Sequence, residues 1–275
     1  MHCGGKSMTS TTTGQALPVW PTVLEAFASV PANWQAMLRI FWTWIAILFG
    51  VGVLLLNLLP LPGDEYSAAL LLPGLLLTGL LLVALGLLGF ASTAVAWHRL
   101  LLLGEQPPPI YLDVGGRVLP YLGRLVLICL IVLAIELACS IVLYPFGMGL
   151  VLASSQVGSA LFAALVSLPA IFVASRLSIS LPGIAVERPM AFGEAWRITG
   201  SSALQLWGGT VLICLPSFVI GLAFDLSEGS RWAAVLFLAV NFLSAVAAIS
   251  FLSLSYRFFA GAPRPTAPVT GPMPT

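Results

Sequence analysis

Six apolar stretches dominate the sequence, and each is long enough to cross a membrane as a helix. They cover approximately residues 40–60, 69–97, 121–145, 158–179, 205–224 and 232–258. A helix needs about 20 apolar residues to cross the hydrocarbon layer. Lipid offers backbone polar groups no partners, and the nearly continuous apolar run 70–90 lacks the alternation of a barrel strand. The sequence therefore predicts an all-α fold, a polytopic membrane bundle of six transmembrane helices.

The amino-acid composition also indicates that lipid surrounds most of the chain. Of the 275 residues, 59% are hydrophobic and 8% are charged, whereas roughly 25% are charged in an ordinary soluble domain. These values exclude a soluble globular protein and a disordered one. The net charge of +1 excludes a partner nucleic acid held by a basic surface. Membrane lipids are the expected partners, and another membrane protein is a further candidate.

Charges between the spans predict the orientation. Asp64 and Glu65 follow the first span, the segment 146–157 carries no charge, and Arg231 lies in the connection after the fifth. Every other Lys and Arg lies on the opposite side. The positive-inside rule then predicts a multi-pass protein with both termini in the cytoplasm. Tryptophan and tyrosine at the span ends are expected to form aromatic belts, with Trp34, Trp42, Trp44, Trp97, Trp207, Tyr121 and Tyr256 on the cytoplasmic side.

Outside the spans, the ends of the chain are polar or rich in proline. We expect a disordered segment over 1–19, a six-helix transmembrane domain over 20–260, and a disordered tail over 261–275, which holds five prolines in fifteen residues.

Similar short segments precede the odd-numbered spans and indicate an internal repeat. Residues 24–27 read Leu-Glu-Ala-Phe, residues 193–196 read Gly-Glu-Ala-Trp, and the weaker counterpart 112–114 reads Leu-Asp-Val. We expect three short interfacial helices on the cytoplasmic side, each followed by a transmembrane hairpin, with a threefold arrangement.

An arginine closes each even-numbered span at its cytoplasmic edge: Arg99, Arg176 and Arg257. A cation there complements the helix dipole and can reach lipid phosphates, so these arginines are candidates for facing phosphate. Binding of a ligand is the alternative interpretation.

Two polar residues stand out within the spans. Glu136 lies twelve residues beyond Arg124, which is about 18 Å into a layer of about 30 Å. Asn241 enters from the other side to a similar depth. We expect them to face each other, either as a proton or cation site or as an interhelical hydrogen bond. Pro169 and Pro216 interrupt the fourth and fifth spans, as helix breaks do at some transport sites, although proline is also common in membrane helices.

Reactive groups are scarce. The cysteines form no CxxC pair, and His98 is the only histidine near a span. No metal site and no cofactor are therefore predicted, and catalysis is disfavoured because no catalytic residues converge.

Two pieces of sequence carry a family resemblance. They are residues 94–105, which include Trp97-His98-Arg99, and residues 176–196, which include Pro182-Gly and Glu187-Arg188-Pro189. The arrangement resembles uncharacterised six-span proteobacterial inner-membrane proteins, which are distantly similar to the membrane domain of bacterial glycerophosphodiester phosphodiesterases. The resemblance implies the bacterial inner membrane but no phosphodiesterase activity, since the catalytic domain is missing.

Two hypotheses follow. The first is a non-catalytic accessory, scaffold or lipid-interacting bundle, indicated by the lack of reactive clusters and by the interfacial segments. The second is a transporter or channel for a small solute or ion, indicated by Glu136, the prolines and the repeat. A pore needs polar residues at successive depths, and only one such layer is evident.

Overall fold

Six long apolar helices account for most of the chain that the structure describes. The computed structural model describes residues 16–58, 65–152, 156–226 and 231–261, and no strand occurs among them. The elements are α1 (Val19–Ala32), α2 (Trp34–Leu58), α3 (Glu65–Leu103), α4 (Val118–Leu152), α5 (Gln156–Ser178), α6 (Ser180–Ala185), α7 (Phe192–Ile198), a 3-10 turn (Gly200–Ser202), α8 (Ala203–Leu226) and α9 (Arg231–Ala260). Six of these helices are long and apolar enough to cross a membrane, which confirms the predicted fold class.

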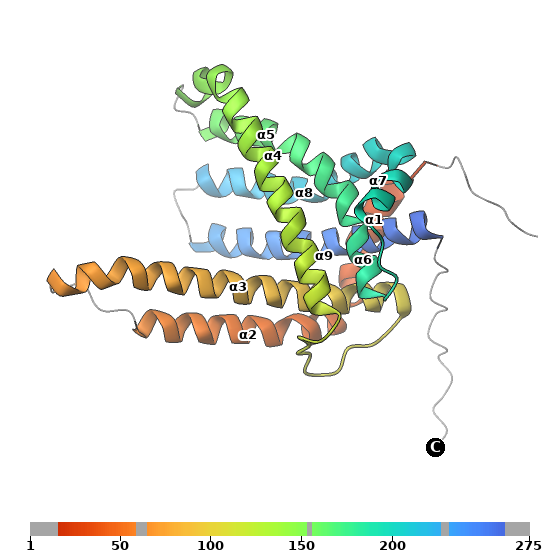
Figure 1. Cartoon of the computed structure of the whole chain (residues 1–275), viewed down its shortest axis with the longest axis horizontal. Coiled ribbons are helices and arrows are strands. Elements are labelled where there is room, and N and C mark those ends of the chain that lie inside the picture. Colours follow the sequence, from red (N-terminus) through yellow and green to blue (C-terminus); the bar gives the residue numbers. More distant parts are fainter. Residues whose placement is uncertain (1–15, 59–64, 153–155, 227–230, 262–275) are drawn as a thin grey trace, which may run out of the picture.

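The six long helices pair as three hairpins that share one end. These are α2 with α3, α4 with α5, and α8 with α9. The hairpins join where α3 packs on α4 and α9, and where α5 packs on α8. We call the end at which α3, α5 and α9 finish the cationic end (right in Figure 1). Arginines of the described chain gather there: Arg39, Arg99, Arg117, Arg124, Arg176, Arg188, Arg197 and Arg257.

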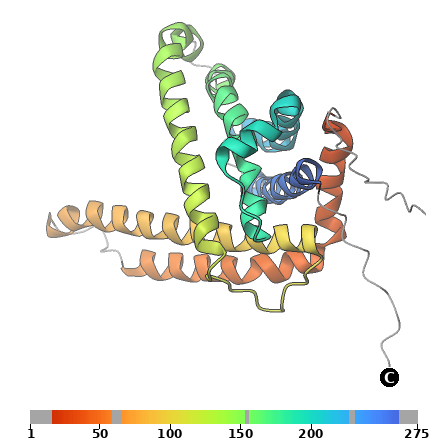
Figure 2. The same cartoon turned by 45° about the vertical axis from the view of Figure 1, so that its right-hand side comes forward.

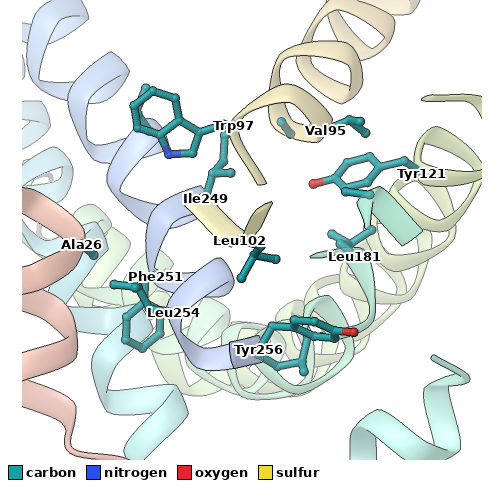
Figure 3. Close-up of a cluster of buried hydrophobic side chains, with 14 of the residues drawn as sticks. Ala26, Val95, Trp97, Leu102, Tyr121, Leu181, Ile249, Phe251, Leu254 and Tyr256 are labelled. Atoms are coloured by element: carbon teal, nitrogen blue, oxygen red, sulfur yellow. The ribbon is translucent and has the colours of Figure 1, made fainter. Parts of the chain in front are cut away.

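Away from the cationic end the hairpins diverge. Figure 2 shows α4 pointing away from the α2–α3 hairpin while both start from the same region. Buried side chains gather near the cationic end, where Trp97, Tyr121, Phe251 and Tyr256 belong to one cluster (Figure 3). In the diverging part, by contrast, Leu77 is 70% exposed. Packing between protein side chains therefore holds the long helices together at the cationic end, whereas further along the hairpins the side chains have few protein contacts.

Short helices close the cationic end. The helix α1 runs across the ends of the long helices (Figure 2) and packs on α9 and α8. Its buried residues Val23, Ala26 and Val30 recur at helical spacing, whereas Trp20 and Leu24 stay exposed. This is the amphipathic pattern expected of the first interfacial segment.

The middle interfacial helix is a correction to the sequence analysis. The first and last predicted segments form α1 and α7, but residues 111–114 form no helix and Val118 begins α4 directly. The segment from 105 to 113 includes three consecutive prolines at 107–109, which lack the N–H groups that a helix needs. The remaining short helix at this end is α6, which follows the fourth span.

The predicted helix breaks also need correction. Pro169 lies inside α5 and Pro216 inside α8, and both helices continue through them. A proline removes one hydrogen bond but need not end a membrane helix, because neighbouring groups can satisfy the freed carbonyl.

The described part of the chain begins at residue 16, slightly before the predicted start of the domain at residue 20. Leu17 is buried, and its backbone N–H donates to Ser202 Oγ at 3.2 Å. The other residues predicted to be disordered, 1–15 and 262–275, lie outside the described parts of the chain.

Several predicted belt aromatics are core residues instead. Trp44, Trp97, Tyr121 and Tyr256 are buried, whereas Trp34 and Trp42 are exposed, as a belt requires. Position at a span end does not distinguish the two groups, because the core itself lies at that end.

Candidate functional site at the cationic end

A hydrogen-bonded histidine lies at the centre of the cationic end. His98 of α3 is fully buried, with Nδ1 2.7 Å from Ser253 Oγ of α9 and Nε2 3.1 Å from the Tyr121 hydroxyl of α4. Ser253 Oγ in turn donates to the carbonyl of Ile249 at 3.0 Å. One assignment satisfies all of these groups: Tyr121 donates to Nε2, and Nδ1–H donates to Ser253. A neutral imidazole thus joins three long helices.

The neighbouring tryptophan extends this network to a fourth helix. The indole N–H of Trp97 donates to Ser250 Oγ at 2.8 Å, and the Ser29 hydroxyl of α1 lies 2.9 Å from the same oxygen. Ser250 donates to the carbonyl of Val246 at 2.9 Å. The indole of Trp97 and the hydroxyls of Ser29 and Ser250 are therefore satisfied within the protein, which avoids the cost of an unpaired polar group.

A serine within hydrogen-bond reach of a histidine also occurs in nucleophilic enzymes. Here both Ser253 and His98 are fully buried, and neither lines any of the cavities described below. The arrangement, as it stands, connects three helices through buried hydrogen bonds.

The three span-ending arginines have partners within the protein. Arg257 donates to Glu25 of α1 at 2.9 Å. Arg176 donates to Thr199 Oγ1 at 3.1 Å and to the Trp196 carbonyl, and its guanidinium lies 3.6 Å from the centroid of the Trp196 ring. Arg257 thus fastens α1, and Arg176 fastens α7. Facing lipid phosphates stays a prediction for them, but their main contacts are structural.

Arg99 belongs to a cluster of charges around the loop between α3 and α4. It donates to Glu105 at 2.5 Å and to the Ala185 carbonyl at 2.9 Å. Glu187, which has φ of 60°, pairs with Arg117 and lies 3.8 Å from Arg99. The cluster borders a cavity of about 130 Å³ that Tyr111 also lines. The opposite charges largely cancel, so the cavity offers no free cationic site.

Within this cluster, the phenol of Tyr111 has a shifted pKa. Its burial, followed by the negative charge of Asp113, raises the pKa of Tyr111 to about 12, against the lowering effects of the Ser92 hydrogen bond and of Arg99 and Arg117. The phenol therefore stays neutral over the physiological pH range.

The structure does not bring Glu136 and Asn241 together. The Asn241 amide donates to the carbonyl of Phe237 at 2.8 Å, one turn earlier on α9. The helix of Glu136, α4, packs on α3, α5 and α6, whereas α9 packs mainly on α1, α3 and α8. Among the described residues, none forms a hydrogen bond or ion pair with Glu136. The predicted pairing is wrong because similar depth does not make two helices neighbours.

The segments of α5 and α8 that contain Pro169 and Pro216 form the walls of one groove, although neither proline lines it. It has a volume of about 380 Å³ and is lined by residues between 163 and 171 of α5 and between 211 and 218 of α8. The Trp207 indole N–H donates to the Leu168 carbonyl at 3.2 Å and connects the two walls. Apart from Ser167 and Cys214, the lining is apolar. Two smaller cavities lie nearby. The one among α2, α3 and α9 is almost wholly apolar, whereas the lining of the one among α5, α8 and α9 includes Ser175, Ser178 and Thr210.

Sequence reasoning missed the role of His98 and the groove. A usable signal existed for the first, since Ser250 and Ser253 lie three residues apart and therefore near one face of the last span. Nothing in the sequence shows which helices form the walls of the groove.

The described residues contain no group of three or more His, Cys, Asp or Glu side chains that could hold a metal ion. Comparison of the chain with protein-family models, with curated proteins and with solved structures finds no match in any of the three.

Proposed function

We propose that this chain is a non-catalytic membrane bundle that acts as an accessory or scaffold protein and contacts lipids through its diverging hairpins. The observation that carries the proposal is the contrast between the packed cationic end and the diverging hairpins. The buried polar side chains of Trp97, His98 and Arg176 are hydrogen-bonded inside the cationic end, whereas long helices further out present apolar side chains with little packing between them. A fold of this kind exposes a large apolar surface, and lipid or another membrane protein must cover it.

The cavities at membrane depth favour this function over transport. A pathway for an ion or solute needs polar groups at successive depths. The groove between α5 and α8 and the cavity among α2, α3 and α9 are instead almost wholly apolar.

We further propose that the protein belongs to the bacterial inner membrane, with the cationic end in the cytoplasm. Support comes from the family resemblance of residues 94–105 and 176–196 and from the arginines gathered at that end. Cationic segments are retained on the cytoplasmic side during insertion.

Transport remains the second candidate because of Glu136. A carboxyl group without a partner within a span is costly and is typical of proton or ion pathways. The Glu136→Gln variant keeps the size of the side chain and removes its proton-binding oxygen, so it separates the two functions.

Flux through reconstituted vesicles provides the test. We expect vesicles containing the protein to leak protons, Na⁺ and K⁺ no faster than protein-free vesicles, as followed by an internal pH dye and ion-sensitive dyes. Flux that requires the protein and is abolished by Glu136→Gln would overturn the scaffold proposal and establish transport. Asn241→Leu serves as the control, because the side chain of Asn241 donates to the Phe237 carbonyl of its own helix.

A further inference from the structure

The groove between α5 and α8 has the depth of one leaflet. Counting from Arg176 at the cationic end, Ile171 lies about 8 Å and Ala163 about 20 Å along α5. One half of the hydrocarbon layer is about 15 Å thick, and helix tilt shortens the depth that a helix covers. The groove therefore starts below the polar surface and ends near the middle of the membrane.

The groove also opens toward lipid. Ala163, Leu215 and Phe218 line it and are exposed, so its mouth lies on the outer surface of the two helices. Its volume of about 380 Å³ falls at the lower end of the range for small-molecule pockets. Because acyl chains surround this surface, they are the apolar groups available to fill it.

An exposed arginine lies on α7, at the cationic end of the α5–α8 pair. The helix α7 packs on α5, and the following turn packs on α8, so α7 belongs to the cationic end of the same pair. Arg197 of α7 is exposed and has no hydrogen bond or ion pair among the described residues, unlike Arg176. Trp196 beside it is 40% exposed and forms an edge contact with Phe172 of α5. An indole and a guanidinium at this level suit a phospholipid headgroup.

We propose that the α5–α8 groove holds one acyl chain of an anionic phospholipid from the leaflet at the cationic end, with its phosphate at Arg197. The proposal rests on the lipid-contacting function above and adds a defined site to it. A general lipid surface would bind all lipids with similar affinity. The affinity of this site depends both on the acyl chain in the groove and on the charge of the headgroup.

Two filling variants test the acyl chain. Ala164→Phe on α5 and Val211→Phe on α8 each place a ring in the groove from an opposite wall. The matched control is Ala138→Phe on α4, which is exposed and outside the groove. The full-length protein is purified, given palmitoyl-oleoyl-phosphatidylglycerol, and examined by native mass spectrometry for retained lipid. We expect one lipid per chain, and about tenfold weaker retention in both filling variants but not in the control.

The headgroup is tested by charge. We expect the wild type to retain phosphatidylglycerol in preference to phosphatidylcholine with the same chains, and Arg197→Gln to lose that preference. Arg39→Gln is the control, because Arg39 is also exposed and unpaired but lies on α2.

Equal retention by Ala138→Phe, Ala164→Phe and Val211→Phe would overturn the proposal. So would equal retention of both lipids by the wild type. If one filling variant fails to fold, as judged by its helical circular dichroism, the other decides. These failures differ from failure of the proposed function, which would show as flux through vesicles and does not depend on lipid retention.

Discussion

His98 shows how one polar side chain can organise an apolar core. Each of its ring nitrogens has a partner on a different helix, Ser253 on α9 and Tyr121 on α4. In a core that excludes water, the partners of a lost hydrogen bond stay unpaired, and this raises the cost of losing it.

We expect His98→Ala to lower the free energy of unfolding by about 2–3 kcal/mol, because it leaves a cavity and a Tyr121 hydroxyl group without its acceptor. Ser253→Ala should cost less, and the double variant should cost less than the sum of the two. Denaturant unfolding in lipid–detergent micelles measures all three. Additive effects would show that the histidine and serine act independently.

The phenol of Tyr111 makes the free energy of unfolding depend on pH in the alkaline range. Its pKa is raised to about 12, above its usual value near 10, so the folded state binds the phenolic proton more tightly than the unfolded state. Its contribution is therefore complete below pH 10 and is lost as the pH rises from about 10 to about 12. Because the phenol is partly exposed, we expect a loss of only about 1 kcal/mol.

Thermal unfolding between pH 9 and pH 12 measures this effect. In Tyr111→Phe, the decrease over this interval should be smaller than in the wild type. An identical decrease in both proteins would assign the alkaline transition to other groups.

At the level of elements, close approach of α8 and α9 depends on a glycine. A Cβ atom added to Gly209 would lie 2.3 Å from Cζ of Phe251, a side chain that is fully buried. A Cβ at the neighbouring Gly208 would meet nothing within 4 Å.

We therefore expect Gly209→Ala to destabilise the protein by about 1–3 kcal/mol through overpacking. Gly208→Ala is the matched control and should be neutral or slightly stabilising, since alanine favours helix. Measuring the melting temperatures of the two variants under the same conditions compares their stabilities. Equal melting temperatures would mean that α8 and α9 can separate without cost.

The six long helices can be predicted from the sequence, but which helices pack on one another cannot. The six spans are predictable because their length and apolarity suffice. These spans are apolar on nearly every side, so no stripe identifies the face that packs on another helix. For this reason the depth of Glu136 could be calculated, whereas its pairing with Asn241 could not. Trp97 and Tyr121 were likewise placed at the correct end but not in the core.

At the scale of the whole molecule, the hairpins should separate with distance from the cationic end (Figure 2). Spin labels at Val83 of α3 and Leu137 of α4, introduced as cysteines after the native cysteines are replaced, should give a broad, long distance distribution in nanodiscs. Labels at Leu103 and Leu119, near the cationic end, should give a narrower and shorter one. Two equally narrow distributions would show that the hairpins close on each other in the membrane.

The contact between α1 and α9 has a consequence for synthesis. Ser29 meets Ser250 across 221 positions of the chain, and Glu25 meets Arg257 across 232. The ribosome releases α1 first and its partner last, so the apolar stripe of α1 must wait on the membrane surface while the other spans insert. A chain that stops before its last span would lack the α9 partner of that stripe, so α1 can reach its final packing only after translation has been completed.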